Sequence, residues 1–144
     1  MNLAQALKKK NRLISELKEI ISEIPNYICE INPNEFRKDY NQMIDSYESK
    51  TKELIDLKVA INKANIGISS KIYALSELKT KLNLLHSIKR NIRTGEVKDY
   101  NGTISIYKSQ ITLNDIDSKI KEVKSLIEKT QDDIDEYNAS TKID

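Results

Sequence analysis

Residues 113–138 read LNDIDSKIKEVKSLIEKTQDDIDEYN, and apolar side chains recur in this stretch at alternating steps of three and four residues. That spacing places the apolar side chains on one face of an α-helix, which we call the seam. The seam comprises Leu113, Ile116, Ile120, Val123, Ile127, Thr130, Ile134 and Tyr137. Thr112 or Asn114 can cap the start, and the acidic Asp115 lies in the first turn, where the helix dipole favours it. The stretch predicts a helix over 113–138.

The same spacing recurs in three further segments, and each segment predicts a helix with its own seam. These helices are expected at about 2–24, 33–65 and 70–93. Their seams are, in order, Leu3, Leu7, Lys10, Ile14, Leu17, Ile21 and Ile24; Phe36, Tyr40, Met43, Tyr47, Lys50, Leu54, Leu57, Ile61 and Ala64; and Leu75, Leu78, Leu82, Leu85, Lys89 and Ile92. Apolar side chains beside the seams, such as Leu13 and Leu126, widen the stripe beyond that of a two-stranded coiled coil.

Start and stop signals set the ends of these helices. Pro25 ends the first, because a proline disfavours helical geometry in the residue before it. Asn32 can cap the second helix and Pro33 suits its first position, while Glu35 can close a capping box. Gly95 follows the third helix and is a C-terminal signal.

Residues 96–111 break the helical pattern. Asn101-Gly102, the leading signal for a two-residue turn, lies there between β-favouring residues, which predicts a β-hairpin. A lone hairpin is marginal in water, so we expect it to find a third strand or a packing surface. The candidate third strand is 27–31, where Tyr27, Cys29 and Ile31 alternate onto one face.

These elements predict a mainly α fold in a single domain over 1–144. The expected architecture is an antiparallel four-helix bundle, coiled-coil-like and with long helices, that has a small β-hairpin or three-stranded sheet at one end. The second and fourth helices are the longest, so part of their seams is expected to project beyond the bundle. Because another copy can cover a projecting apolar seam, we expect a homo-oligomer.

The composition fits one folded chain of 144 residues, with 38% apolar residues, 24 Lys and Arg, and 22 Asp and Glu. The one cysteine, Cys29, cannot form an internal disulfide, and with the one histidine, His86, it cannot make a zinc cluster. We expect neither a signal peptide nor a transmembrane helix, because no window approaches about 18 apolar residues. This favours a cytoplasmic location and leaves non-classical export open.

Charge is distributed unevenly along the chain. Residues 66–93 carry six basic side chains and one acidic one, whereas residues 112–144 carry five basic and nine acidic ones. One interpretation is a patch that binds nucleic-acid phosphates, and its candidate residues are Lys79, Lys81, Lys89, Arg90 and Arg93. The other is that complementary charges place the third helix beside the fourth. We favour the second interpretation, since no nucleic-acid-reading motif accompanies the lysines.

The sequence offers little chemistry for catalysis or metal binding. A di-iron or di-manganese bundle needs Glu-x-x-His pairs, but Asn83 stands three positions before His86. Cys29 is expected to be a small apolar strand residue, and the acidic run 132–136 a solvated helix end without the loop glycine of an EF-hand. The glycines are too scattered for a phosphate loop. We therefore expect no catalytic, metal or cofactor site, and no enzyme.

Four segments of the sequence also resemble those of a known protein family. The residues that carry the likeness are Met1-Asn2-Leu3-Ala4-Gln5-Ala6-Leu7, Ile61-Asn62-Lys63-Ala64-Asn65, Ala74-Leu75-Ser76-Glu77-Leu78 and Tyr137-Asn138-Ala139-Ser140-Thr141-Lys142-Ile143. In these segments the chain resembles a family of small, largely uncharacterised prokaryotic helical proteins grouped under the name septicolysin. The family name implies a membrane-active, pore-forming protein.

Three functions follow as expectations. The first is a non-enzymatic helical protein that acts through protein–protein contact or self-association, with its protein partner unknown. The second is the cytolysin-like, membrane-active protein that the resemblance implies, in which amphipathic helices open onto lipid. The third is nucleic-acid binding through the basic third helix, which predicts a steep dependence on salt.

Overall fold

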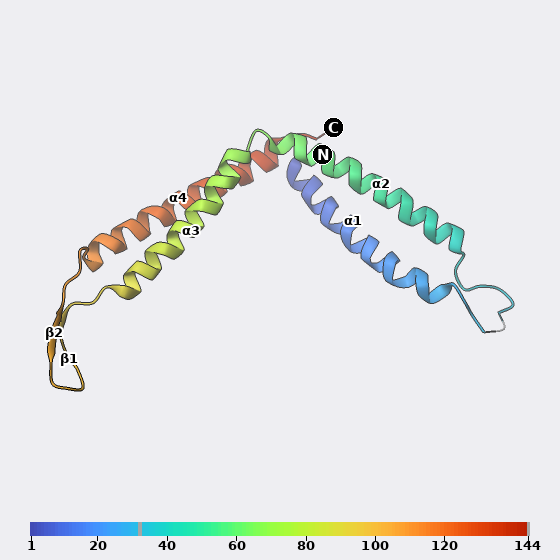
Figure 1. Ribbon diagram of the computed structural model, residues 1–144. Helices are drawn as coiled ribbons and strands as arrows, with labels where there is room; N and C mark the ends of the chain where they lie inside the picture. The colour runs from blue at the N-terminus through green and yellow to red at the C-terminus, as the bar shows by residue number, and fades with distance from the viewer. Residues whose placement is uncertain (32, 144) are drawn as a thin grey trace. The chain divides into compact units, whose positions relative to one another are not determined.

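The computed structural model describes residues 1–31 and 33–143. In chain order its elements are α1 (Leu3–Glu23), the 3-10 helix η1 (Ile24–Tyr27), α2 (Tyr40–Asn65), α3 (Ser69–Asn91), β1 (Gly95–Lys98), β2 (Ile104–Tyr107) and α4 (Leu113–Ser140). Figure 1 shows the four helices as two antiparallel pairs, α1 with α2 and α3 with α4. The prediction of a mainly helical chain with a small antiparallel hairpin is confirmed.

The chain divides into two compact units. The first comprises Met1–Ile68 and Asp135–Asp144, and the second comprises Ser69–Ile134. The buried apolar side chains of the described residues include one cluster in each unit. A four-helix bundle around one shared core is not confirmed, because one of these clusters joins α1 with α2 and the other joins α3 with α4.

The first unit is an α1–α2 hairpin with a core along the facing seams. Its buried cluster is Leu3, Ala6, Leu13, Leu17, Leu54, Leu57 and Ile61, and Tyr47, Ala64 and Ile143 are among the partly buried side chains packed against it. Asn2 caps α1: its side-chain Oδ1 accepts the Gln5 N–H at 2.8 Å, and the Gln5 Oε1 accepts the Asn2 N–H at 3.0 Å. This reciprocal capping box fixes where α1 begins.

The second unit is an α3–α4 hairpin that carries the two strands between its helices. Its buried cluster is Leu85, Ile116, Ile120 and Val123, with Leu78, Leu82, Ile88, Ile92, Ile111 and Ile127 packed against it. Most of these side chains occupy the seams that the sequence predicts. The periodic pattern therefore identifies the face along which α3 and α4 pack.

The start of α2 differs from the prediction. The sequence predicts a helix over 33–65, whereas α2 begins at Tyr40, with the Asp39 side chain accepting the Gln42 N–H at 3.1 Å. The predicted cap Asn32 lies outside the described residues, and Pro33 and Glu35 lie in the connection before the helix. Since α1 has 21 residues and α2 has 26, a helix beginning at residue 33 would extend its seam past any partner in this hairpin.

The prediction of a third strand at 27–31 is wrong. Residues Ile24–Tyr27 form a 3-10 turn that extends α1, with Pro25 in its first turn, and the sheet has the two strands β1 and β2. Proline presets the backbone φ of a helical first turn, so it bends the end of α1 into η1. Cys29 therefore lies exposed in the connection that follows η1.

The turn of the hairpin is one residue longer than the two-residue turn that Asn101-Gly102 predicts. The Asp99 N–H donates to the Thr103 carbonyl at 2.9 Å, which leaves three residues in the loop. The Gly102 N–H donates to the Asp99 carbonyl at 3.0 Å, and Gly102 has φ +82°. A type I turn followed by a left-handed glycine is the common three-residue hairpin loop, and it sets the register Lys98↔Ile104.

The C-terminal segment closes the first unit. The Leu3 N–H donates to the Thr141 carbonyl at 2.8 Å, and the Ile143 N–H donates to the Met1 carbonyl at 3.0 Å. The Tyr137 hydroxyl donates to the Ala64 carbonyl at 2.7 Å. These bonds hold the end of α4 and the residues after it against the start of α1 and the end of α2.

We predict that Ile116→Ala, at a position 1% exposed in the second core, lowers the free energy of unfolding by about 2–5 kcal/mol, because it removes a fully packed side chain and leaves a cavity. Urea denaturation followed by circular dichroism measures this change. The control is Leu126→Ala on the same helix at a 44% exposed position, which should change the stability by less than about 1 kcal/mol. Equal effects from the two variants would contradict the assignment of the core.

A second prediction concerns Gly67, where an added Cβ would stand 2.5 Å from the Tyr137 hydroxyl oxygen. Gly67→Ala should destabilise the first unit by about 1–3 kcal/mol through overpacking, and Tyr137→Phe by about 1 kcal/mol through loss of the hydrogen bond to Ala64. The double variant lacks the clashing oxygen, so it should lose less stability than the two single losses combined. Strict additivity in thermal melts of the four proteins would show that the two sites do not touch.

Candidate functional site

Side chains that could bind a metal are not grouped together in the part of the chain that the structure describes. No group of three or more His, Cys, Asp or Glu side chains within residues 1–31 and 33–143 is placed to hold a metal ion. His86 is half-buried on α3, and Cys29 is exposed in a connection of the other unit. No described polar or charged residue is buried, so no side chain there combines ionisable chemistry with exclusion from water.

Two residues of the candidate basic patch, Lys89 and Arg93, contact other side chains of the second unit. The Lys89 Nζ lies 2.7 Å from the Asp117 Oδ1 on α4, and the Arg93 guanidinium lies 5.8 Å from the centre of the Tyr107 ring. Lys79 and Lys81 are two residues apart, so they project ~160° apart around the helix, and Arg93 lies beyond the end of α3 at Asn91. The five basic residues therefore do not share one helix face, and nucleic-acid binding stays a prediction.

Opposite charges join α3 to α4 near both ends of the pair. Besides the Lys89–Asp117 pair, the Lys71 Nζ lies 2.7 Å from the Asp133 Oδ2, and this hydrogen bond lowers the pKa of the Asp133 carboxyl. The pairs connect the basic helix with the acidic one, as the alternative interpretation of the charges expects. In this hairpin, α3 and α4 are therefore held together by ion pairs as well as by the apolar seam.

Lysines also connect α1 and α2. Lys50, which interrupts the predicted seam of α2, places its Nζ 2.7 Å from the Glu16 Oε2 on α1. Lys9 places its Nζ 2.6 Å from the Glu53 Oε1. The hydrogen bond from Lys50 lowers the pKa of the Glu16 carboxyl, and that from Lys9 lowers the pKa of the Glu53 carboxyl. Lys50, the lysine that interrupts the apolar seam of α2, therefore forms an ion pair with α1.

A cationic cluster in the connection between η1 and α2 was not predicted. The Arg37 Nε lies 2.9 Å from the Glu30 Oε1, and the Lys38 Nζ lies 2.9 Å from the Glu23 Oε2. Both cations lie over the Tyr27 ring, at 5.1 Å for Arg37 and 4.7 Å for Lys38. The predicted helix over 33–65 concealed this arrangement, although two acidic and two basic residues flanking one tyrosine were a signal for it.

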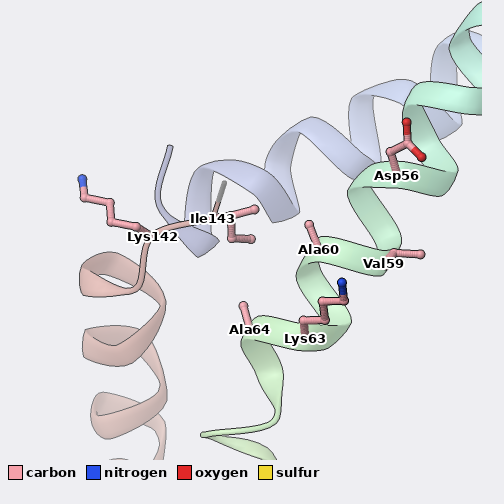
Figure 2. A pocket seen from close by; sticks show the side chains of 7 residues that line it. All are labelled: Asp56, Val59, Ala60, Lys63, Ala64, Lys142 and Ile143. Carbon is pink, nitrogen blue, oxygen red and sulfur yellow. The ribbon is translucent and has the colours of Figure 1, made fainter.

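A groove of about 580 Å³ lies between α2 and the C-terminal segment in the first unit. Its lining is Asp56, Val59, Ala60, Lys63, Ala64, Lys142 and Ile143. Figure 2 shows Ile143 between the start of α1 and α2, with Ala60 and Ala64 on the adjacent side of α2. The ionisable side chains of the lining are all exposed, so the groove contains no acid–base pair shielded from water.

Among the exposed large apolar side chains of the described residues, one group lies at one end of each hairpin, while others, such as Ile66 and Tyr73, lie elsewhere. At the end of the α1–α2 hairpin that bears the connection between η1 and α2, the exposed residues are Ile28, Ile31, Phe36 and Tyr40, which we call the loop-end surface. At the end of the α3–α4 hairpin that bears the strands, they are Val97, Tyr100, Ile104, Ile106, Tyr107 and Leu113, which we call the hairpin-end surface. Tyr40 and Leu113 are seam positions at the starts of the two longest helices, and each is 51% exposed.

Comparison with protein-family models, with curated proteins and with solved structures finds no match. The resemblance to the septicolysin family stays a prediction. In the described part of the chain, no helix is both long and apolar enough to cross a membrane.

We predict that Lys50→Gln raises the pKa of the Glu16 carboxyl toward its ordinary value of 4.5, because the hydrogen bond from Lys50 is the largest cause of its lowering. A group whose pKa is lowered in the folded state stabilises the fold above its unfolded pKa, and that contribution is lost as the pH falls through the folded pKa. Any stability advantage of the wild type over the variant should thus disappear in acid. Nuclear magnetic resonance titration of the Glu16 side chain measures the shift.

The matched control for this titration is Lys52→Gln, two residues along α2, where no ion pair to Glu16 is present. It should leave the Glu16 titration unchanged. An identical response to both substitutions would contradict a specific Lys50–Glu16 pair.

Proposed function

We propose that the protein is a non-enzymatic helical protein that acts through protein–protein contact, beginning with self-association. The observation that carries this proposal is the pair of uncovered apolar ends, the loop-end surface and the hairpin-end surface. Clusters of large apolar side chains at a protein surface are typical of contact sites. Self-association is the simplest contact, because each copy supplies both surfaces.

The starts of two helices support the same proposal. The first seam positions of the two longer helices, Tyr40 and Leu113, are exposed. A second copy that covers these positions would remove apolar surface from water. This burial stabilises the association by ~25 cal/mol per Å² of apolar surface.

We propose that the four-helix bundle expected from the sequence forms between two copies of the chain. A two-helix hairpin buries one seam and leaves the flanks of both helices open. A hairpin of a second copy packed on those flanks would surround the seam with four helices, which is a common arrangement for helices of this length. Ile21, a seam position of α1 that is 56% exposed, would then become buried.

We predict that light scattering over a micromolar concentration series gives a mass that is a multiple of 16.6 kDa. Phe36→Ser tests the loop-end surface and Ile104→Ser tests the hairpin-end surface, and at least one of them should shift the protein toward monomer. The control is Ile55→Ser, because Ile55 is 55% exposed on α2 away from both ends and its replacement should leave the mass unchanged.

A monomer at every concentration would overturn the proposal, as would dissociation caused by Ile55→Ser alone. Dye release from liposomes by the wild type would instead support the membrane-active alternative. Binding to DNA that weakens steeply with salt would support the nucleic-acid alternative.

A further inference from the structure

The hairpin β1–β2 has a free edge along β1. Its two strands pair in the register Gly95↔Tyr107, Glu96↔Ile106, Val97↔Ser105 and Lys98↔Ile104, and all eight residues are exposed. An isolated two-stranded hairpin is marginal in water, and three or more strands are needed for independent stability. The expected third strand at 27–31 is absent from this sheet. The edge of β1 is therefore open to another strand.

The hydrogen-bond phase of the hairpin determines which residues a new strand can reach. The Asp99 N–H bonds the Thr103 carbonyl, and bonded and non-bonded pairs alternate along an antiparallel ladder. Val97↔Ser105 is therefore a bonded pair, whereas Glu96 and Lys98 belong to non-bonded pairs. Consequently the backbone N–H and C=O groups of Glu96 and Lys98 face the free edge.

The side chains at these two positions are complementary in charge. Glu96 and Lys98 lie on the same face of β1, where each is opposite an isoleucine of β2. Neither has an ionic partner within residues 1–31 and 33–143. An antiparallel strand that places Lys opposite Glu96 and Glu opposite Lys98 would satisfy both charges.

We propose that β1 pairs with β1 of a second copy, antiparallel and about a two-fold axis through Val97. In this register Glu96 of each copy is opposite Lys98 of the other, and the two Val97 side chains meet on the other face. The backbone groups that face the edge are those of Glu96 and Lys98, so this register completes hydrogen bonds along the edge, and the charges select it from the other registers that would do so. The product is a four-stranded sheet in the order β2-β1-β1-β2.

The edge of β2 is the competing site. If β2 paired with β2 of a second copy about a two-fold axis through Ser105, Ile104 of each copy would lie opposite Ile106 of the other. Glu96 and Lys98 would then have no partners in the second copy. Charge matching therefore favours β1. Because this inference rests on the proposed self-association and specifies where it occurs, its experiments separate the two statements.

The first experiment exchanges the charges and measures the dimer dissociation constant by sedimentation. Glu96→Lys and Lys98→Glu each place like charges opposite each other twice in the dimer, and each should raise the dissociation constant ~10-fold. The double variant E96K/K98E restores opposite charges and should restore the wild-type constant. Constants that do not respond to the single variants would overturn the inference while leaving self-association intact. A wild type that remains monomeric would overturn both statements.

The second experiment uses disulfide trapping in a Cys29→Ser background. Val97→Cys places two thiols at the two-fold axis in a non-bonded pair, where Cα atoms stand about 4.5 Å apart, within the range that a disulfide spans. Mild oxidation should yield a covalent dimer. The matched control is Ser105→Cys, which lies opposite Val97 in the hairpin and marks the axis of the competing β2 pairing.

Cross-linking through Val97→Cys but not through Ser105→Cys supports pairing along β1. Cross-linking through Ser105→Cys alone assigns the contact to β2 and overturns the inference. Equal cross-linking of both variants indicates random collision of exposed thiols and also overturns it, as does the absence of cross-linking in a protein that light scattering shows to be dimeric.

Discussion

Packing along a single apolar seam holds each unit of this protein together. Isolated helices of this length are marginal in water, so α1 and α2 stabilise each other, as do α3 and α4. The first seam residues of α2 and α4, Tyr40 and Leu113, are each 51% exposed, so the packing along each seam is incomplete where these two helices begin.

Charged side chains add specificity to this packing. Lys50 interrupts an apolar seam, yet its ammonium group reaches Glu16 on the facing helix, and the pairs Lys71–Asp133 and Lys89–Asp117 match the basic helix with the acidic one. Each pair is partly exposed, and exposed pairs contribute little to stability. Their contribution is to favour one register of the two helices over others, since a shift along the seam would separate several pairs at once.

Periodicity predicted the local structure well and the long-range packing poorly. The seam positions Ile116, Ile120 and Val123 are buried as predicted, because a three-and-four spacing has one solution on a helix. On α1 the buried face shifts to include Ala6, which a hydrophobicity pattern undervalues because alanine is small. The same spacing serves a two-helix hairpin and a four-helix bundle equally well, so it could not tell how many helices share a core.

The β-hairpin that carries the proposed contact was also predictable from the sequence only in part. Asn101-Gly102 located the hairpin, but the loop gained a residue because the Asp99 side chain accepts the Asn101 and Thr103 N–H groups and stabilises a wider turn. The complementary pair Glu96 and Lys98 is visible in the sequence only after the register and phase of the strands are known. Edge pairing depends on backbone direction, which the residue types do not encode.

The bonds from Leu3 to Thr141 and from Ile143 to Met1 connect the first residues of the chain with the last that are described. During synthesis the α1–α2 hairpin can pack early, because its contacts are close in sequence. The closing bonds form only after all of α3, the strands and α4 have left the ribosome. The first unit is therefore complete only when the last helix has been synthesised, although its α1–α2 hairpin is synthesised first.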